Sequence, residues 1–248
     1  VMPLSAFSAP TRAWFTASFP GPTPVQTRGW AAIATGQDTL LLAPTGSGKT
    51  LAAFLWSIDQ LVSSPQEGLQ VLYVSPMKAL VADVQRNLQA PLAGIRAAGE
   101  GVPEISVEMR TGDTDAASRR RFLRSAPHIL VTTPESLYLL LSSKAREQLR
   151  TVRTVIVDEI HALAGNKRGV HLALSLERLA GLCETPPQRV GLSATQRPLA
   201  EIAAFLAGAD AQGAARPVQI VDASGLPTAR ISVEVPAERL DAPDAPVT

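Results

Sequence analysis

Short apolar runs alternate with longer stretches of helical periodicity along most of the chain. The runs are rich in Val, Ile and Leu and bounded by polar residues, which is typical of strands buried on both faces. We expect strands at residues 40–43, 71–75, 105–109, 129–132, 152–158, 190–193 and 218–221. Helical spacing is found over residues 23–33, 50–56, 78–98, 115–124, 134–142, 170–182 and 198–206. This alternation predicts an α/β protein with three α/β/α layers around a parallel sheet.

Composition changes at both ends of the chain. Residues 1–24 are rich in Pro, Ala and Ser, and after Gly208 the chain is dominated by Ala, Pro and Gly. Such segments are typical of extensions and linkers rather than of a packed core. We therefore expect one α/β domain over residues 1–208, with residues 1–24 as an N-terminal extension and residues 209–248 as a linker.

The overall composition favours a soluble globular protein. Of the 248 residues, 46% are hydrophobic and 18% are charged, which is enough apolar material for a sizeable core. The formal net charge of +1 indicates no general attraction to polyanions, so a nucleic-acid-binding surface would have to be local. One cysteine, Cys183, allows no internal disulfide. No apolar run approaches the ~18 residues of a membrane span, and we expect a cytoplasmic protein with no membrane partner.

The stretch after the first strand has the residues of a phosphate-binding loop. Glycines let backbone N–H groups surround anionic oxygens, and the N-terminus of the following helix adds partial positive charge. The nucleotide-binding residues would be Thr45, Gly46, Ser47, Gly48, Lys49 and Thr50. Lys49 would reach the β- and γ-phosphates, and the Thr50 hydroxyl would bind Mg²⁺. The strict pattern opens with Gly, whereas this sequence has Ala43 there.

A pair of acids ends the strand predicted at residues 152–158. In open α/β sheets ligands bind at the carboxyl ends of the strands, so Asp158 and Glu159 would face the nucleotide phosphates. Asp158 would bind Mg²⁺, and Glu159 would orient and deprotonate the attacking water. Beside the phosphate-binding loop, this pair predicts hydrolysis and not only binding. His161 follows closely, and taken alone it is more simply a structural histidine.

Three motifs resemble those of superfamily 2 helicases, in the same order along the chain. Residues 43–50 resemble motif I, residues 158–161 resemble motif II, and residues 193–195 resemble motif III. The resemblance implies a RecA-like P-loop NTPase lobe with ATP and Mg²⁺ as cofactors. It also implies that His161 links ATP state to Ser193 and Thr195, which couple it to strand binding. Gln26 resembles the Q-motif glutamine, which reads the adenine edge.

Further segments resemble the strand-binding motifs of the same helicases. Such motifs contact phosphates through backbone N–H groups, hydroxyls and helix N-termini. The implied nucleic-acid contacts are Ser75, Pro76, Lys78, Thr111, Gly112, Asp113, Thr132, Thr133, Pro134, Glu135, Lys167 and Arg168. For Pro134 a helix start explains the residue equally simply, and for Lys167 and Arg168 so does a solvated pair of loop charges. The basic run at 119–124 fits the charged face of an amphipathic helix better than a phosphate-binding stripe.

Longer matches narrow the resemblance to the large helicase-related (Lhr) family. They lie at residues 110–114, 132–143, 167–179 and 191–195, and the resemblance covers about residues 19–208. It implies an ATP-dependent 3′-to-5′ translocase on single-stranded DNA that unwinds DNA or RNA–DNA duplexes in DNA repair.

Helicases of this class bind ATP between two RecA-like lobes, and the second lobe supplies an arginine finger. No Gln-x-x-Gly-Arg-x-x-Arg motif follows Thr195. We therefore expect the chain to be the first lobe of a longer helicase, with residues 209–248 as linker and start of the second lobe. An arginine finger is worth ~10³–10⁵ in turnover, so the chain alone should hydrolyse ATP poorly.

Three alternatives compete with this interpretation. One is an RNA helicase of another DExH branch, and one is a nucleic-acid-binding scaffold that does not turn over ATP. The third, a GTP-hydrolysing switch, is disfavoured because Asn166-Lys167 is followed by Gly169 where a guanine-reading motif needs Asp.

Overall fold

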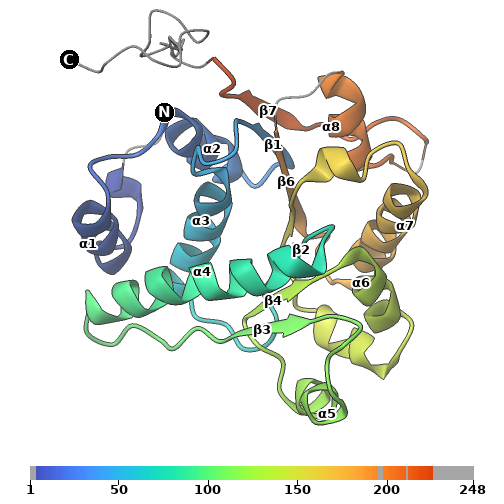
Figure 1. The fold of residues 1–248 in the computed structure, drawn as a ribbon, viewed down its shortest axis with the longest axis horizontal. Coiled ribbons are helices and arrows are strands. Elements are labelled where there is room, and N and C mark those ends of the chain that lie inside the picture. The colour runs from blue at the N-terminus through green and yellow to red at the C-terminus, as the bar shows by residue number, and fades with distance from the viewer. Residues whose placement is uncertain (1–3, 195–197, 211, 226–248) are drawn as a thin grey trace, which may run out of the picture.

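A single parallel sheet forms the centre of the molecule (Figure 1). The structure is a computed structural model, and it describes residues 4–194, 198–210 and 212–225. Within those residues the sheet has seven strands in the order β3-β4-β2-β5-β6-β1-β7. They are β1 Thr39–Leu42, β2 Val71–Val74, β3 Val107–Arg110, β4 Ile129–Thr132, β5 Thr154–Val157, β6 Gln188–Ser193 and β7 Gln219–Asp222.

Helices connect the strands and cover the sheet. They are α1 Ala9–Ser18, α2 Pro24–Ile33, α3 Lys49–Ser63, α4 Lys78–Ala97, α5 Ala116–Arg124, α6 Pro134–Leu141, α7 Lys167–Leu182 and α8 Leu199–Ala207. Short 3₁₀ turns lie at η1 Leu4–Ala6, η2 Lys144–Leu149 and η3 Ile160–Ala162. Of the helices in the described ranges, none combines the length and apolar character needed to cross a bilayer.

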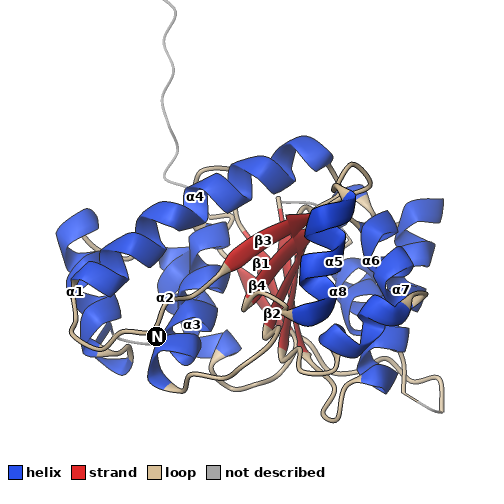
Figure 2. Cartoon of the chain, turned by 90° about the horizontal axis from the view of Figure 1, so that it is seen from below, coloured by secondary structure: helices blue, strands red, loops and turns tan. Residues whose placement is uncertain are grey.

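Alternation of side chains along each strand divides the core into two halves. Leu41 and Ile156 belong to one buried cluster together with side chains of α1 to α4. Leu40 and Val155 belong to a second cluster with side chains of α5 to α8. Figure 2 shows the strands between these two groups of helices. Because both faces are covered, the strands β1, β2, β4 and β5 carry apolar residues at nearly every position. The predicted three-layer α/β/α fold is confirmed.

The structure extends the sequence prediction at both ends of the predicted domain. The N-terminal extension forms helix α1, which packs against α4 through Trp14 and buries Phe15 in the core. Beyond the boundary expected at residue 208, strand β7 pairs in parallel with β1, so the sheet continues to Asp222. Composition marked residues 209–248 as a linker because a single edge strand contributes few core side chains.

One buried guanidinium joins β6 to the helices on its face. The Arg189 side chain is 3% exposed and donates to the carbonyl oxygens of Leu206 at 3.1 Å and Leu176 at 3.3 Å. It also pairs with the carboxylate of Glu177 at 3.0 Å, which bonds Arg216 from its other side. Burial alone raises the pKa of Glu177, but the Arg216 hydrogen bond and the nearby Arg189 charge lower it overall. This cluster fixes α7 and α8 against the sheet.

Replacing this arginine tests its structural role. We expect Arg189→Met to lower the free energy of unfolding by about 3 kcal/mol, at the low end for breaking a buried ion pair because Glu177 keeps its second partner. Urea unfolding measures the change. Arg153→Met is the matched control, since the exposed Arg153 side chain has, within the described residues, a single hydrogen bond, to Gln66 at 3.4 Å. Its loss should change stability by less than about 0.5 kcal/mol. Equal midpoints for the two variants would contradict the role.

Candidate functional site

Except for Gln26, which lies on α2 before β1, the segments with predicted chemistry follow the carboxyl ends of the strands. This follows from the parallel pairing of the strands. In spatial order, β3, β4 and β2 lead into predicted nucleic-acid segments, and β5, β6 and β1 lead into the predicted nucleotide segments. Lys167 and Arg168 also follow β5, and Arg168 reaches the turn after β2 at Pro76. One edge of the sheet therefore carries two neighbouring half-sites, which meet between β2 and β5.

Side chains at the start of α2 form hydrogen bonds to the phosphate-binding loop. Gly46 and Gly48 adopt positive φ angles of 81° and 87°, which only glycine takes without cost. The Thr23 hydroxyl donates to the Ser47 carbonyl at 2.9 Å, and the Gln26 amide donates to the Gly48 carbonyl at 3.5 Å. Two loop carbonyls are thus occupied on the α2 side, which favours a conformation that leaves N–H groups for an anion.

The start of α3 faces a pocket of about 360 Å³. Lys49, Thr50 and Glu159 line it, and its inner wall is apolar, formed by Leu51, Phe54, Val84, Leu88 and Pro91. The Lys49 side chain is buried, and its Nζ donates to the Pro44 carbonyl at 3.4 Å. The first N–H groups of a helix have no partner inside the helix. The pocket therefore joins an ammonium, backbone donors and a carboxylate.

The residues present fit a nucleotide phosphate and Mg²⁺. Among the described side chains, the Ser47 hydroxyl is buried without a hydrogen-bond partner, and a phosphate oxygen would satisfy it. Mg²⁺ prefers oxygen ligands, and the Thr50 hydroxyl and Asp158 carboxylate are of that kind. These two residues would hold the ion, and Lys49 would neutralise phosphate charge.

The acidic pair after β5 is tightly held. Asp158 is 7% exposed, and its Oδ1 accepts from the Glu159 backbone N–H at 2.9 Å. Its Oδ2 accepts from the hydroxyl of Tyr73 on β2. Burial and the neighbouring Asp158 charge raise the pKa of Tyr73 well above its usual value, so the phenol remains a donor. Glu159 has a φ of 45°, the one positive value outside glycine in the described residues, a strained geometry often found at functional sites.

Glu159, His161 and Ser193 form a connected series. The His161 Nε2 lies 3.3 Å from the Glu159 carboxylate, and its Nδ1 lies 3.2 Å from the Ser193 hydroxyl. The series joins the end of β5 to the end of β6. The structure thus brings Glu159, predicted to be the catalytic base, together with two of the three residues predicted for coupling. Thr195, the third of these, lies outside the described residues.

The predicted nucleic-acid residues separate into a buried and an exposed group. The buried ones are Ser75, Pro76, Thr132, Thr133 and Pro134. The Thr132 hydroxyl donates to the Arg110 carbonyl at 2.6 Å, and the Thr133 hydroxyl caps α6 at the Ser136 N–H. The exposed or half-exposed ones are Lys78, Thr111, Gly112, Asp113, Glu135, Lys167 and Arg168. Mainly the exposed residues could therefore contact a nucleic-acid strand through their side chains.

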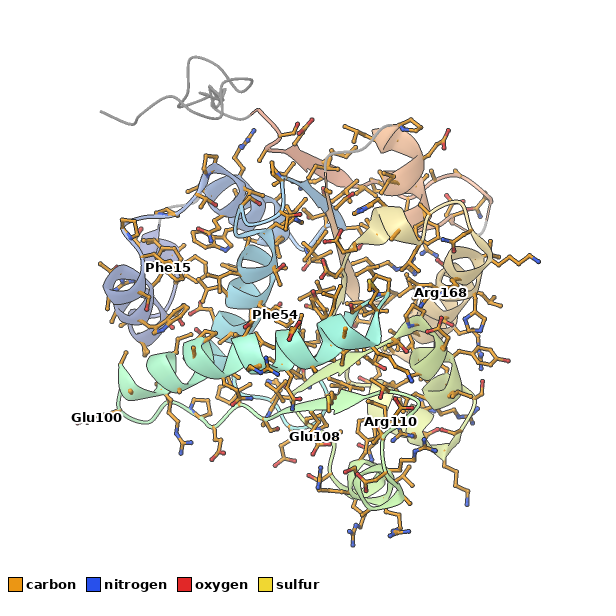
Figure 3. All side chains as sticks on the ribbon, in the orientation of Figure 1. Phe15, Phe54, Glu100, Glu108, Arg110 and Arg168 are labelled. Carbon is orange, nitrogen blue, oxygen red and sulfur yellow. The ribbon has the colours of Figure 1, made fainter. Side chains whose placement is uncertain are left out.

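Two exposed ion pairs connect the loops of the nucleic-acid half. Lys78 at the start of α4 pairs with Asp113 after β3 at 2.8 Å. Arg168 lies near the start of α7 (Figure 3). It pairs with Glu135 on α6 at 2.7 Å and also donates to the Pro76 carbonyl at 2.7 Å. Burial alone raises the pKa of Glu135, but the Arg168 bond lowers it overall. These contacts connect the starts of α4, α6 and α7 and the turns before them at the carboxyl ends of the strands.

One predicted residue and two missed residues change the picture of the nucleotide half. Gln26 is 4% exposed, and its amide bonds the Thr23 backbone and the Gly48 carbonyl. In this structure the side chain predicted to read adenine holds the loop. Thr23 and Tyr73 were missed by sequence reasoning. Thr23 was detectable, because Thr23-x-x-Gln26 is a capping box, and the structure forms it. Tyr73 had no local signal.

Comparison with known proteins places these features in a family. Residues 23–202 match the DEAD/DEAH box helicase family. The chain is 50% identical over 248 residues to the Lhr helicase/uracil glycosylase of Escherichia coli, covering 95% of this chain and 16% of that protein. It is 48% identical over 240 residues to the ATP-dependent helicase Lhr-Core of Methanothermobacter thermautotrophicus, covering 93% of this chain and 28% of the relative.

The fold is similar to a solved helicase structure. The chain superimposes on Mycobacterium smegmatis helicase Lhr bound to ssDNA and AMP-PNP with a TM-score of 0.83 and 57% identity. The match covers 90% of this chain and 28% of that one. Similarity to the DEAD-box helicase Mss116, with a TM-score of 0.72 and 19% identity, supports the fold alone. The chain spans less than a third of each of these Lhr relatives.

The loop geometry makes Gly48 a sensitive position. A Cβ there would lie 2.6 Å from the Gln26 amide nitrogen, and its φ of 87° disfavours any other residue. We expect Gly48→Ala to weaken binding of a fluorescent ATP analogue at least about tenfold, or ~1.4 kcal/mol. Gly181→Ala is the control, because nothing lies within 4 Å of a Cβ there and its φ is not strained. Unchanged affinity in Gly48→Ala would contradict the described loop conformation.

Proposed function

This chain belongs to the DEAD/DEAH box helicase family, and from that premise we propose that it is the ATP-binding lobe of an Lhr-type helicase that translocates along single-stranded DNA. The supporting observation is the division of one sheet edge between β2 and β5. The phosphate-binding loop and the acidic pair lie on one side, and the predicted strand-binding loops lie on the other. A cycle of ATP binding and hydrolysis would thereby alter the contacts with the DNA strand, because the two half-sites are neighbours.

The residues of the nucleotide half have separate tasks in this proposal. The loop N–H groups, the Ser47 hydroxyl and Lys49 bind the phosphates and neutralise their charge. Bound Mg²⁺ would neutralise the charge that develops as the γ-phosphate departs. Thr50 and Asp158 hold that ion, and Glu159 orients the attacking water and accepts its proton. The His161 contact restricts the position of the Glu159 carboxylate.

DNA as the substrate is supported by a relative of known structure. The Mycobacterium smegmatis Lhr helicase was solved with ssDNA and AMP-PNP, and the present chain is 57% identical to it over the matched part. We extend to this chain the family properties inferred from sequence: 3′-to-5′ polarity, unwinding of DNA and RNA–DNA duplexes, and a role in DNA repair. RNA as the preferred strand, or strand binding without turnover, are the competing functions.

The proposal includes a second RecA-like lobe in the same parent chain. The first lobe comprises residues 1–208 and also the edge strand β7, because β7 completes the same sheet. The second lobe would follow and supply an arginine to the transferred phosphoryl group. Its absence would lower turnover by ~10³–10⁵ while leaving the phosphate-binding loop intact.

ATP turnover tests the proposed function. We expect this chain to bind a fluorescent ATP analogue and single-stranded DNA but to hydrolyse ATP slowly. A longer chain with the second lobe should hydrolyse ATP faster by three or more orders of magnitude, with stimulation by single-stranded DNA. Glu159→Gln in that chain should lower turnover by about 10²–10⁴ with nucleotide affinity retained.

The outcome separates the competing functions. Stimulation by single-stranded RNA and not by DNA would replace DNA with RNA as the substrate. Binding of either strand with no turnover in the two-lobe chain would support a scaffold. Equal turnover in Glu159→Gln and the unaltered chain would contradict the assignment of the base.

Salt dependence of DNA binding tests how Arg168 acts. Arg168 bonds both Glu135 and the turn at Pro76, so we expect it to hold the two loops in place. Arg168→Ala and Glu135→Gln should then weaken single-strand binding to similar extents, with the slope of log K against log salt unchanged. A direct phosphate contact would instead reduce that slope by about 0.7 in Arg168→Ala, and Glu135→Gln would strengthen binding. Fluorescence anisotropy over a salt series distinguishes these outcomes.

A further inference from the structure

The side chain of Tyr73 crosses from β2, which leads into the nucleic-acid half, to the nucleotide half. It lies on β2, is fully buried, and donates its hydroxyl to Asp158 Oδ2. The strands β2 and β5 are neighbours and pair in parallel, with Val74 opposite Val157. The Asp158 N–H donates to the Val74 carbonyl at 2.9 Å, which places the carboxylate beside the phenol.

The ring is held in one position by α3. Phe54 stacks on Tyr73 with ring centroids 4.8 Å apart and an interplanar angle of 19°. Phe54 is 1% exposed and lies in the same helix that begins with Lys49 (Figure 3). Stacking and burial restrict rotation of the Tyr73 ring. The position of its hydroxyl is therefore fixed by the packed core.

Packing alone does not call for a phenol at this position. The other central strands place aliphatic side chains in the same cluster: Leu41 on β1, Val131 on β4, Ile156 on β5 and Leu192 on β6. A hydroxyl on this face must find a partner, since an unpaired buried polar group is costly. Its partner is the carboxylate expected to hold Mg²⁺.

The hydrogen bonds of Asp158 leave its carboxylate with free acceptor positions for Mg²⁺. Each Asp158 oxygen accepts one protein donor: Oδ1 from the Glu159 N–H and Oδ2 from Tyr73. An ionised carboxylate has about four acceptor positions, so two remain for the ion or its water ligands. A carboxylate whose rotation is already restricted loses less entropy when the ion binds.

We propose that Tyr73 is a positioning residue that orients Asp158 for the nucleotide-bound Mg²⁺. This inference rests on the proposed ATP-binding function. Tyr73 does not touch the ion or the nucleotide, and it acts through the Asp158 carboxylate. Loss of its hydroxyl should therefore change the dependence of nucleotide binding on Mg²⁺ and not the binding of the nucleotide itself.

Tyr73→Phe tests this in the chain as it stands, because it removes the hydroxyl and keeps the stacked ring. Binding of a fluorescent ATP analogue is titrated with Mg²⁺ and measured separately in EDTA. We expect the half-saturating Mg²⁺ concentration to rise about tenfold, the low end for loss of a partner of a metal ligand. Affinity in EDTA should be unchanged. Thermal unfolding shows whether the variant is folded.

Two further variants define the result. Tyr138→Phe is the matched control, because Tyr138 is the other tyrosine of the chain and lies on α6 away from Asp158, so its Mg²⁺ dependence should equal that of the unaltered chain. Asp158→Asn should remove most of the Mg²⁺ dependence. Adding Tyr73→Phe to Asp158→Asn should then have no further effect, because the two residues act as one unit.

The alternatives give different readouts. An unchanged Mg²⁺ dependence in Tyr73→Phe, or an equal loss of affinity in EDTA, would overturn the inference and assign Tyr73 to packing. An unaltered chain without any Mg²⁺-dependent nucleotide binding would overturn the proposed function, and this inference with it. Normal Mg²⁺ dependence in the unaltered chain separates the first failure from the second.

Discussion

The parallel direction of the strands is the constraint on which the rest of this structure depends. Each crossover returns the chain to the same end of the sheet, so the loops after β1 to β6 all leave at one edge. Parallel strands need cover on both faces, and the two apolar clusters provide it. A site assembled from motifs far apart in sequence therefore follows from the topology, and the buried sheet holds its parts rigidly.

The two predicted half-sites adjoin at the boundary between β2 and β5. On one face of the sheet Tyr73 reaches Asp158, and near the strand ends Arg168 holds the turn after β2. Farther along, His161 joins Glu159 to Ser193. Each link is a direct polar contact made by one side chain. In the proposed function, the nucleotide and the nucleic-acid contacts would therefore be separated by single side chains and not by a long pathway.

Sequence patterns predicted most of this fold because the signals are local. Each apolar run had the length and the polar flanks of a buried strand, and the central strands were placed within two residues of their observed bounds. The exceptions have physical reasons. The segment of helix α1 was assigned to an extension because of its Pro, Ala and Ser content, and the helix is stabilised by packing of Phe15 against Phe19 and Trp30. A strand was expected at residues 218–221, but the sequence pattern did not reveal that β7 would join the same sheet by pairing with β1.

For the site, the sequence by itself determined the kinds of residues and their order. The glycines at 46 and 48 and the acids after β5 carry their chemistry in the local backbone, so a linear motif identifies them. Only the tertiary structure decided which side chains meet. Tyr73 and Asp158 form a hydrogen bond although 85 positions separate them. Gln26 donates to the Gly48 carbonyl of the phosphate-binding loop. The physical reason is that hydrogen-bond partners are chosen by distance and burial in the folded chain, and neither leaves a periodic trace in the sequence.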